Sequence, residues 1–147
     1  MIDAVKPKRT HFALEMMPRA IPDSPDGYLK LLKAVDREAF GVHVDVCNMV
    51  SSVQRFFENA QIIDECFRKL GRWVVSCHAK DLAGARVHLA ETVPSRGGID
   101  YRAYLRAIAA HSPQAPLLIE HLRTPDEYEE GKRYVLKVAG EVGITFA

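Results

Sequence analysis

PLLIEH, residues 116–121, is the stretch of this sequence that decides the fold. It is a short apolar run that follows Pro116 and ends in a carboxylate, and such a run is typical of a buried parallel strand. Three earlier stretches share this design, an apolar run whose last position carries an acid or an imidazole. They are residues 12–14 followed by Glu15, residues 42–44 followed by Asp45, and residues 73–77 followed by His78.

The four strand ends are spaced at intervals of 30, 33 and 42 residues, each about one strand plus one crossover helix. This alternation predicts an α/β fold in which four consecutive βα units place their strands in one parallel sheet, with helices on one side. We expect a single domain over residues 1–147, with units at about 10–40, 41–71, 72–112 and 115–147. Ligands of such sheets bind beyond the carboxyl ends of the strands, which is where all four residues fall.

Capping residues support the predicted helices. Ser24 precedes Pro25, Asp100 precedes an apolar face, and Thr124 precedes a proline and a capping-box glutamate. That apolar face comprises Tyr101, Tyr104, Leu105 and Ile108.

The helix of the second unit shows the clearest period, and its stripe comprises Phe56, Ala60, Ile63, Phe67 and Leu70. Gly71 follows where a left-handed terminal residue is favoured. The sequence predicts strands at residues 10–17, 42–47 and 73–78, and a long functional loop over residues 79–98.

Composition excludes several classes of protein. Hydrophobic residues at 48% and charged residues at 27% are ordinary for a globular chain, and the net charge of +1 gives no basis for binding nucleic acid. No apolar run approaches the roughly 18 residues of a membrane helix, and the N-terminus lacks a signal-peptide core. Three cysteines without metal-finger spacing predict reduced thiols in a cytoplasmic protein, with Cys47 and Cys77 as buried packing residues.

The strand-end residues form a candidate metal set. An acid after a strand is most often a solvated loop residue or a helix cap, and a lone histidine is most often a satisfied polar residue. Four successive strands ending in ligand types make a stronger case together. Three carboxylates and one imidazole suit Mn²⁺, Mg²⁺ or Co²⁺ better than a structural zinc, with Zn²⁺ as a further option.

Five motifs in this order resemble the C-terminal half of the sugar phosphate isomerase/epimerase family. They are FALEMMP (12–18), VHVDVCN (42–48), VVSCHAKD (74–81), PSRGGIDY (94–101) and PLLIEHL (116–122). The most specific pieces are H-x-K-D at 78–81, G-G-I-D at 97–100 and I-E at 119–120. The resemblance covers residues 10 to about 143, and it implies the xylose isomerase-like TIM barrel, whose last four strands carry a Glu, Asp, His, Glu metal site.

The resemblance implies roles for individual residues. The metal ligands it implies are Glu15, Asp45, His78 and Glu120. Glu15 and Glu120 also match the two carboxylates that move protons in the family's epimerases. The implied reaction is a metal-dependent isomerisation or epimerisation of a sugar or sugar phosphate, in which a proton leaves the carbon next to a carbonyl and the metal stabilises the enediolate.

Substrate contacts are expected from Asn48, Lys80, Arg96 and Arg123, which lie just beyond the strand ends. For the two arginines and the lysine, an ordinary surface position beside acidic residues is an equally good interpretation. Asn48 stands where the family commonly has histidine; it can bind a hydroxyl but cannot relay a proton near neutral pH. His43 precedes Asp45 by two residues and should share its face, deeper under the site.

The chain matches only half of a barrel that takes about 250 residues. The alternatives are a natural half-barrel, a truncated reading frame, or one part of a two-part enzyme. The competing function is therefore a catalytically inactive or incomplete half-barrel that associates with itself or with a separate N-terminal half. An abasic-site endonuclease of the same superfamily is a weaker match, because such enzymes have extra histidine ligands and a basic DNA face.

An open sheet of four strands has two unpaired edges. Its concave face is expected to expose apolar side chains such as Leu118 and Val44, or their neighbours along the pleat. We therefore expect a homodimer, or a pair with a separate N-terminal half, rather than a free monomer. The expected partners are otherwise a small sugar or sugar phosphate, with neither nucleic acid nor a membrane.

Overall fold

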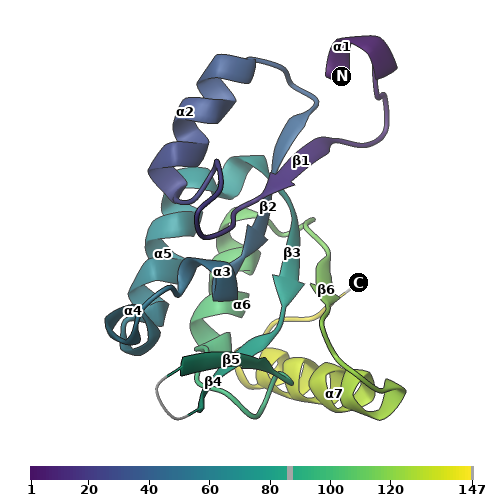
Figure 1. Cartoon of the computed structure of the whole chain (residues 1–147). Helices are drawn as coiled ribbons and strands as arrows, with labels where there is room; N and C mark the ends of the chain where they lie inside the picture. The colour runs from purple at the N-terminus through teal and green to yellow at the C-terminus, as the bar shows by residue number, and fades with distance from the viewer. Residues whose placement is uncertain (86–87, 147) are drawn as a thin grey trace.

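A four-stranded parallel sheet forms the centre of the molecule (Figure 1). The computed structural model describes residues 1–85 and 88–146. Its strand order is β1-β2-β3-β6, and every neighbouring pair is parallel, as predicted. Over the described residues the sheet stays open and does not close into a barrel. The strands are β1 (Phe12–Glu15), β2 (Phe40–Asp45), β3 (Val74–Ala79) and β6 (Leu117–Ile119).

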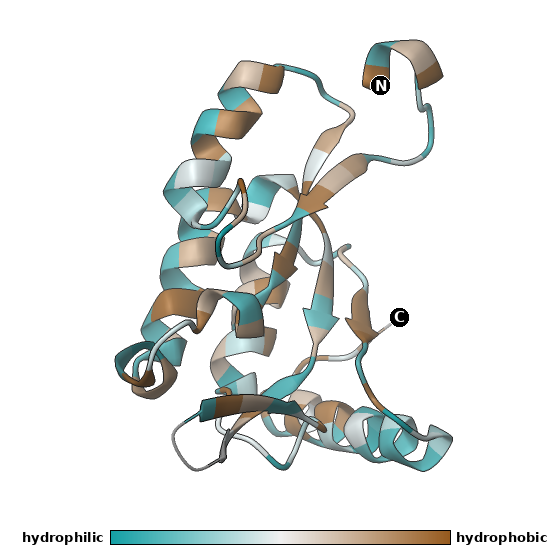
Figure 2. Cartoon of the chain, in the orientation of Figure 1, coloured by the Kyte–Doolittle hydropathy of each residue, from teal (hydrophilic) through white to brown (hydrophobic). Residues whose placement is uncertain are grey.

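Helices α2, α5 and α6 pack along one face of this sheet, and α7 lies below them beside β6 (Figure 1). In Figure 2 hydrophilic and hydrophobic residues alternate along α2 and α5, as expected for helices with one face on a sheet. The principal helices are α2 (Pro25–Val35), α5 (Asn59–Leu70), α6 (Tyr101–His111) and α7 (Pro125–Glu141). The short elements are α1 (Ile2–Val5), α3 (Val46–Met49), α4 (Val53–Phe57) and the 3₁₀ turn η1 (Gly71–Trp73).

The predicted caps are confirmed. The Ser24 side chain accepts from Gly27 N at 3.1 Å, and Asp100 accepts from Ala103 N at 2.9 Å. Thr124 accepts from Glu127 N at 3.3 Å. The Glu127 carboxylate in turn accepts from the backbone N–H of Arg123 at 2.8 Å, one residue earlier than a standard capping box.

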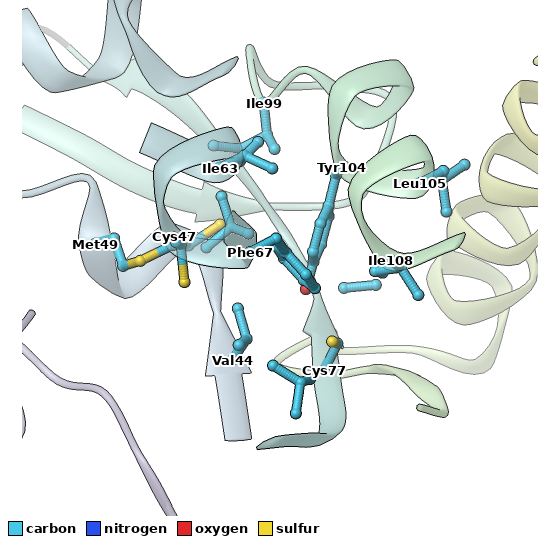
Figure 3. Packing of buried hydrophobic residues seen from close by; sticks show 14 of the residues in the cluster. Val44, Cys47, Met49, Ile63, Phe67, Cys77, Ile99, Tyr104, Leu105 and Ile108 are labelled. Atoms are coloured by element: carbon cyan, nitrogen blue, oxygen red, sulfur yellow. The ribbon is translucent and has the colours of Figure 1, made fainter. Parts of the chain in front are cut away.

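The core lies between the sheet and its helices. Val44 and Cys77 of the sheet meet Phe67 of α5 and Tyr104 of α6 (Figure 3), and the two rings lie 5.9 Å apart. Cys47 and Cys77 are buried packing residues, as predicted. Burial raises the pKa of Cys77 to about 12, as expected of a thiol packed in a core.

Several local predictions were wrong, among them the strand predicted over residues 10–17, which is confined to Phe12–Glu15. Strand β2 ends at Asp45, because α3 begins at Val46 and Asp45 caps it. The apolar stripe from Phe56 to Leu70 is divided between two helices, α4 and α5, which meet at Glu58. Gly71 has φ −49 and ψ −40, so it is not a left-handed terminal residue. A Cβ there would overlap His111, so the absence of a side chain allows α6 to approach.

Residues 79–98 were predicted to be a loop, but they contain an antiparallel pair of strands, β4 (Asp81–Ala85) and β5 (His88–Thr92). The pair lies beyond the carboxyl end of β3 (Figure 1). Asp81, almost fully buried, anchors the segment that follows. Its carboxylate accepts from Leu82 N at 2.8 Å, Ile99 N at 2.9 Å and Gly97 N at 3.2 Å.

A side chain at Gly97 would overlap this carboxylate. The H-x-K-D and G-G-I-D motifs therefore meet in space, and part of their chemistry is structural.

The open face of the sheet is less apolar than predicted. Leu118 is 49% exposed, as expected for that face, but Val44 is fully buried under the helices. Valine and polar residues alternate at positions 42–45, so Val44 shares the helix-covered face with Val42, whereas His43 and Asp45 share the open face. None of the helices in the described part of the chain combines the length and apolar character that a membrane span requires.

Candidate metal centre

The register of the sheet staggers the four strand-end residues. Asp45 pairs directly with His78 across β2 and β3. Glu15 pairs with His43, two residues earlier than Asp45. On the other side His78 pairs with Leu118, so Glu120 lies two residues further along. The long glutamates therefore stand at the outer strands, one step below and one step above the central pair.

This stagger brings all four side chains together. One ligand atom from each of Glu15, Asp45, His78 and Glu120 can be chosen so that all lie within 4.8 Å of one another. His78 Nδ1 is the common neighbour. It lies 3.3 Å from Glu15 Oε1, 3.3 Å from Asp45 Oδ2 and 2.9 Å from Glu120 Oε1.

Lys80 adds a buried positive charge to the cluster. Its side chain is 2% exposed, and Nζ lies 2.8 Å from Asp45 Oδ2 and 2.7 Å from Glu120 Oε1. Burial alone would raise the pKa of Asp45, but the hydrogen bond and charge of Lys80 outweigh burial and hold this pKa below its usual value. Burial likewise lowers the pKa of Lys80, and the two carboxylates raise it above its usual value. The residue predicted to contact substrate is thus ion-paired with two of the candidate ligands.

Glu15 has the opposite electrostatic environment. Burial, and then the hydrogen bond and charge of Asp45, raise its pKa. Asn48 donates from Nδ2 to Glu15 Oε1 at 2.9 Å, and its backbone N–H donates to Asp45 Oδ1 at 3.1 Å. Asn48, predicted as a substrate contact, therefore holds two carboxylates of the cluster.

Two tyrosines of α6 fix the backbone beneath the cluster. Tyr104 Oη donates to the carbonyl of His78 at 2.8 Å, and Tyr101 Oη donates to the carbonyl of Lys80 at 2.9 Å. The helical period placed both rings in the core, but it gave no sign that their hydroxyls would support the site.

Glu91 of β5 is a site neighbour that the sequence did not reveal. Its carboxylate lies 3.1 Å from Lys80 Nζ and 2.7 Å from His121 Nδ1. Burial raises the pKa of Glu91, but the hydrogen bonds from His121 and Lys80 dominate and leave it lowered. The sequence could have indicated the position of Glu91 only if residues 88–92 had been predicted as a strand beside the site.

The predicted arginines have other contacts. The Arg96 guanidinium pairs with Glu130 and Glu127 of α7, and is half exposed. Arg123 is exposed, and among the described residues its hydrogen bond is the backbone one to Glu127. The structure brings neither of them into contact with the four-residue cluster.

His43 lies beneath the cluster, as its spacing from Asp45 indicated. Its ring centroid is 3.9 Å from that of His78 in an edge-on arrangement, and its Nδ1 is 2.6 Å from Ser76 Oγ. Burial, and then the charge of His78, lower the pKa of His43 to about 4.

The donor chemistry fits a divalent cation. Three carboxylates converge on one imidazole nitrogen, and Asp45 is fully buried. Carboxylates held this close repel one another, and Lys80 supplies a single positive charge against Asp45, Glu120 and Glu91. Oxygen donors with one nitrogen suit Mg²⁺, Mn²⁺ or Co²⁺, and they also accept Zn²⁺.

Comparison with known families and structures gives a consistent result. The sequence profile of the family described as "Xylose isomerase-like TIM barrel" matches residues 1–138. None of the curated proteins matches this chain.

Several solved structures share the fold. A xylose isomerase domain protein from Planctomyces limnophilus is 22% identical with a TM-score of 0.66, over 90% of this chain and 45% of that one. A xylose isomerase-like TIM barrel protein from Mycobacterium smegmatis, in complex with magnesium, is 20% identical with a TM-score of 0.69, over 90% and 44%.

D-Psicose 3-epimerase from Clostridium cellulolyticum H10, with D-tagatose, is 15% identical with a TM-score of 0.62, over 91% and 50%. The chain thus spans about half the length of these structures.

Proposed function

This chain belongs to the xylose isomerase-like TIM barrel family, and we propose that it carries the proton-transfer site of a metal-dependent sugar isomerase or epimerase. The observation that supports this most is the convergence of Glu15, Asp45, His78 and Glu120 at the carboxyl ends of four parallel strands. Family membership and a metal-competent cluster at that edge both favour this function over an inert half-barrel. The neighbouring structures contribute the fold and the kind of ligand that their names state.

The same four residues would hold the metal. A divalent cation, when bound, polarises a carbonyl and its neighbouring hydroxyl and so acidifies the hydrogen on the carbon between them. Two features of this chain prepare the site: Asn48 orients Glu15, and Tyr104 fixes the backbone of His78. The magnesium complex of the Mycobacterium smegmatis protein supports a hard divalent metal, and Mn²⁺ or Co²⁺ fits the same donors.

Glu15 and Glu120 are the proposed acid–base pair. They come from the two outer strands, so they can reach a substrate from opposite sides. In the metal-free chain, burial and the neighbouring Asp45 raise the pKa of the Glu15 carboxyl above its usual value. Lys80 holds Glu120 at 2.7 Å and would have to release it when Glu120 acts. Proton return to the same carbon gives an epimer, and return to the adjacent carbon gives an isomer.

Proton exchange tests this pair. We expect the metal-supplemented protein to exchange the hydrogen next to the carbonyl of D-tagatose, D-fructose or a ketose phosphate with solvent deuterium. Glu15→Gln and Glu120→Gln should each slow exchange by roughly 10²–10⁴-fold, because each removes a proton-transfer group. NMR measures the rate, and Glu65→Gln on the outside of α5 is the matched control. Exchange at the wild-type rate in the double variant would exclude the pair.

We also propose that the functional form pairs the free edges of the sheet with a second copy of the chain. Among the described residues, β1 pairs only with β2 and β6 only with β3, so both outer edges are open templates for further strands. Eight strands from two copies would suffice for a closed barrel.

Light scattering at low micromolar concentration should give a mass about twice 16.5 kDa. Leu118→Lys, on the open face, should weaken this dimer at least about tenfold, whereas Leu136→Lys on α7, equally exposed, should not. A monodisperse, cooperatively folded species of 16.5 kDa would refute the homodimer.

A further inference from the structure

A second group of metal-ligating side chains overlaps the first. Ligand atoms of Glu15, His43 and His78 also lie within 4.8 Å of one another. We propose that His43 supplies a second nitrogen ligand to a metal held with Glu15 and His78, and makes this position select zinc or cobalt over magnesium. The inference rests on the proposed metal site and adds a ligand and a metal preference to it.

The sheet register places His43 at the required level. It lies directly opposite Glu15 in the β1–β2 pair and directly opposite Ser76 in the β2–β3 pair. Because it precedes Asp45 by two residues, its side chain leaves the same face of β2. Glu15, the lowest residue of the four-residue cluster, therefore has His43 as its nearest neighbour across the strands.

The hydrogen bonding of His43 is that of a metal ligand whose second nitrogen is supported. Its Nδ1 lies 2.6 Å from Ser76 Oγ, whereas its Nε2 is buried and has no hydrogen-bond partner among the described residues. In neutral imidazole one nitrogen carries the proton and the other a lone pair; in the tautomer whose Nδ1–H donates to Ser76 Oγ, the lone pair is on Nε2. A metal-bound histidine typically donates its other N–H to such a partner.

Packing alone explains His43 poorly. A buried polar atom without a partner is unfavourable, and an apolar side chain would fill the same space without that cost. The edge of its ring faces His78, whose Nδ1 contacts all three carboxylates of the four-residue cluster. The unpartnered nitrogen thus belongs to a residue that adjoins two candidate ligands, Glu15 and His78.

A second imidazole changes which metals the site favours. Carboxylate oxygens alone favour Mg²⁺, whereas imidazole nitrogens favour later transition metals. The set Glu15, His43, His78 contains two nitrogens and one oxygen, which is a donor set common in zinc sites. We therefore expect tighter binding of Zn²⁺ and Co²⁺ than of Mg²⁺, with His43 responsible for much of the difference.

Calorimetric titration of the full chain with Zn²⁺, Co²⁺ and Mg²⁺ tests this, using wild type, His43→Leu and Ser76→Ala. In His43→Leu the Zn²⁺ affinity should fall at least about tenfold while the Mg²⁺ affinity stays within about threefold. Loss of a supporting partner typically costs 10–100-fold, so Ser76→Ala should lower Zn²⁺ affinity about tenfold. The visible absorption of bound Co²⁺ should also change in His43→Leu, because one nitrogen donor is lost.

Circular dichroism establishes whether each variant is folded. If His43→Leu does not fold, the comparison of Ser76→Ala with the wild type tests the proposal. An unchanged ratio of Zn²⁺ to Mg²⁺ affinity in the folded variants would overturn the role of His43 and leave the four-residue site standing. A wild-type chain that binds none of the three metals would overturn both proposals. Metal binding with the expected ratio but no proton exchange would contradict the enzymatic function alone.

Discussion

Replacing His78 with alanine is expected to weaken the binding of Mn²⁺ and Zn²⁺ by at least about 100-fold, the largest effect on binding that we predict. Loss of a mere supporting partner costs 10–100-fold, and His78 is a direct candidate ligand. Its Nδ1 lies within 3.3 Å of carboxylate oxygens of Glu15, Asp45 and Glu120. Without it the three carboxylates keep their repulsion and lose their common neighbour.

Isothermal titration calorimetry of the wild type and His78→Ala measures this loss. His11→Ala is the matched control, because His11 is an exposed histidine just before β1 and makes no contact with the four-residue cluster. The control should bind metal as the wild type does. Equal affinity in all three proteins, or an equal loss in both variants, would refute the assignment of His78.

Replacing Lys80 with methionine is expected to have the largest effect on stability. Asp45 is fully buried, and Lys80 is its buried partner at 2.8 Å. Removing one member of a buried ion pair typically destabilises a protein by about 3–5 kcal/mol, because the other charge stays buried and uncompensated. We expect a loss of this size in the metal-free chain, measured by urea unfolding.

The same substitution should strengthen metal binding. Lys80 is a positive charge that a cation must compete with for Asp45 and Glu120, so its removal leaves a more negative and more available site. A metal at 100 times its Kd stabilises the folded state by about 2.7 kcal/mol, and at a fixed metal concentration Lys80→Met should gain more than the wild type.

Lys69→Met removes ion pairs with two exposed carboxylates, Asp26 of α2 and Glu65 of α5, and should change neither stability nor metal affinity appreciably. A Lys80→Met variant that is as stable as the wild type without metal would contradict the proposed role of Lys80 in compensating the buried charge of Asp45. Weaker metal binding by this variant would contradict the proposed competition between Lys80 and the metal.

The sequence by itself determined that a residue of metal-ligand type stands at or beside the end of each of the four strands. Apolar runs set the strands, and the side chains of Ser24, Asp100 and Thr124 set the start of the helices. Both signals are local, because capping and burial depend on neighbours within a few residues. Since the carboxyl ends of parallel strands share one edge, the order of the units was enough to place Glu15, Asp45, His78 and Glu120 near one another.

Only the tertiary structure decided how far along the strand direction each of these four residues lies relative to the others. Hydrogen bonding between strands from different units sets the stagger that pairs Glu15 with His43 and raises Glu120 to the level of Lys80. Sequence spacing within one strand carries no information about that register.

The burial of Lys80 and the approach of Glu91 have the same origin, because both depend on β4 and β5 folding back over the strand ends. The hydrophobic pattern of residues 79–98 does not specify this pairing. Lys80 also pairs with Asp45 and Glu120, which belong to the units before and after its own, so the sequence of its own unit could not indicate these ion pairs.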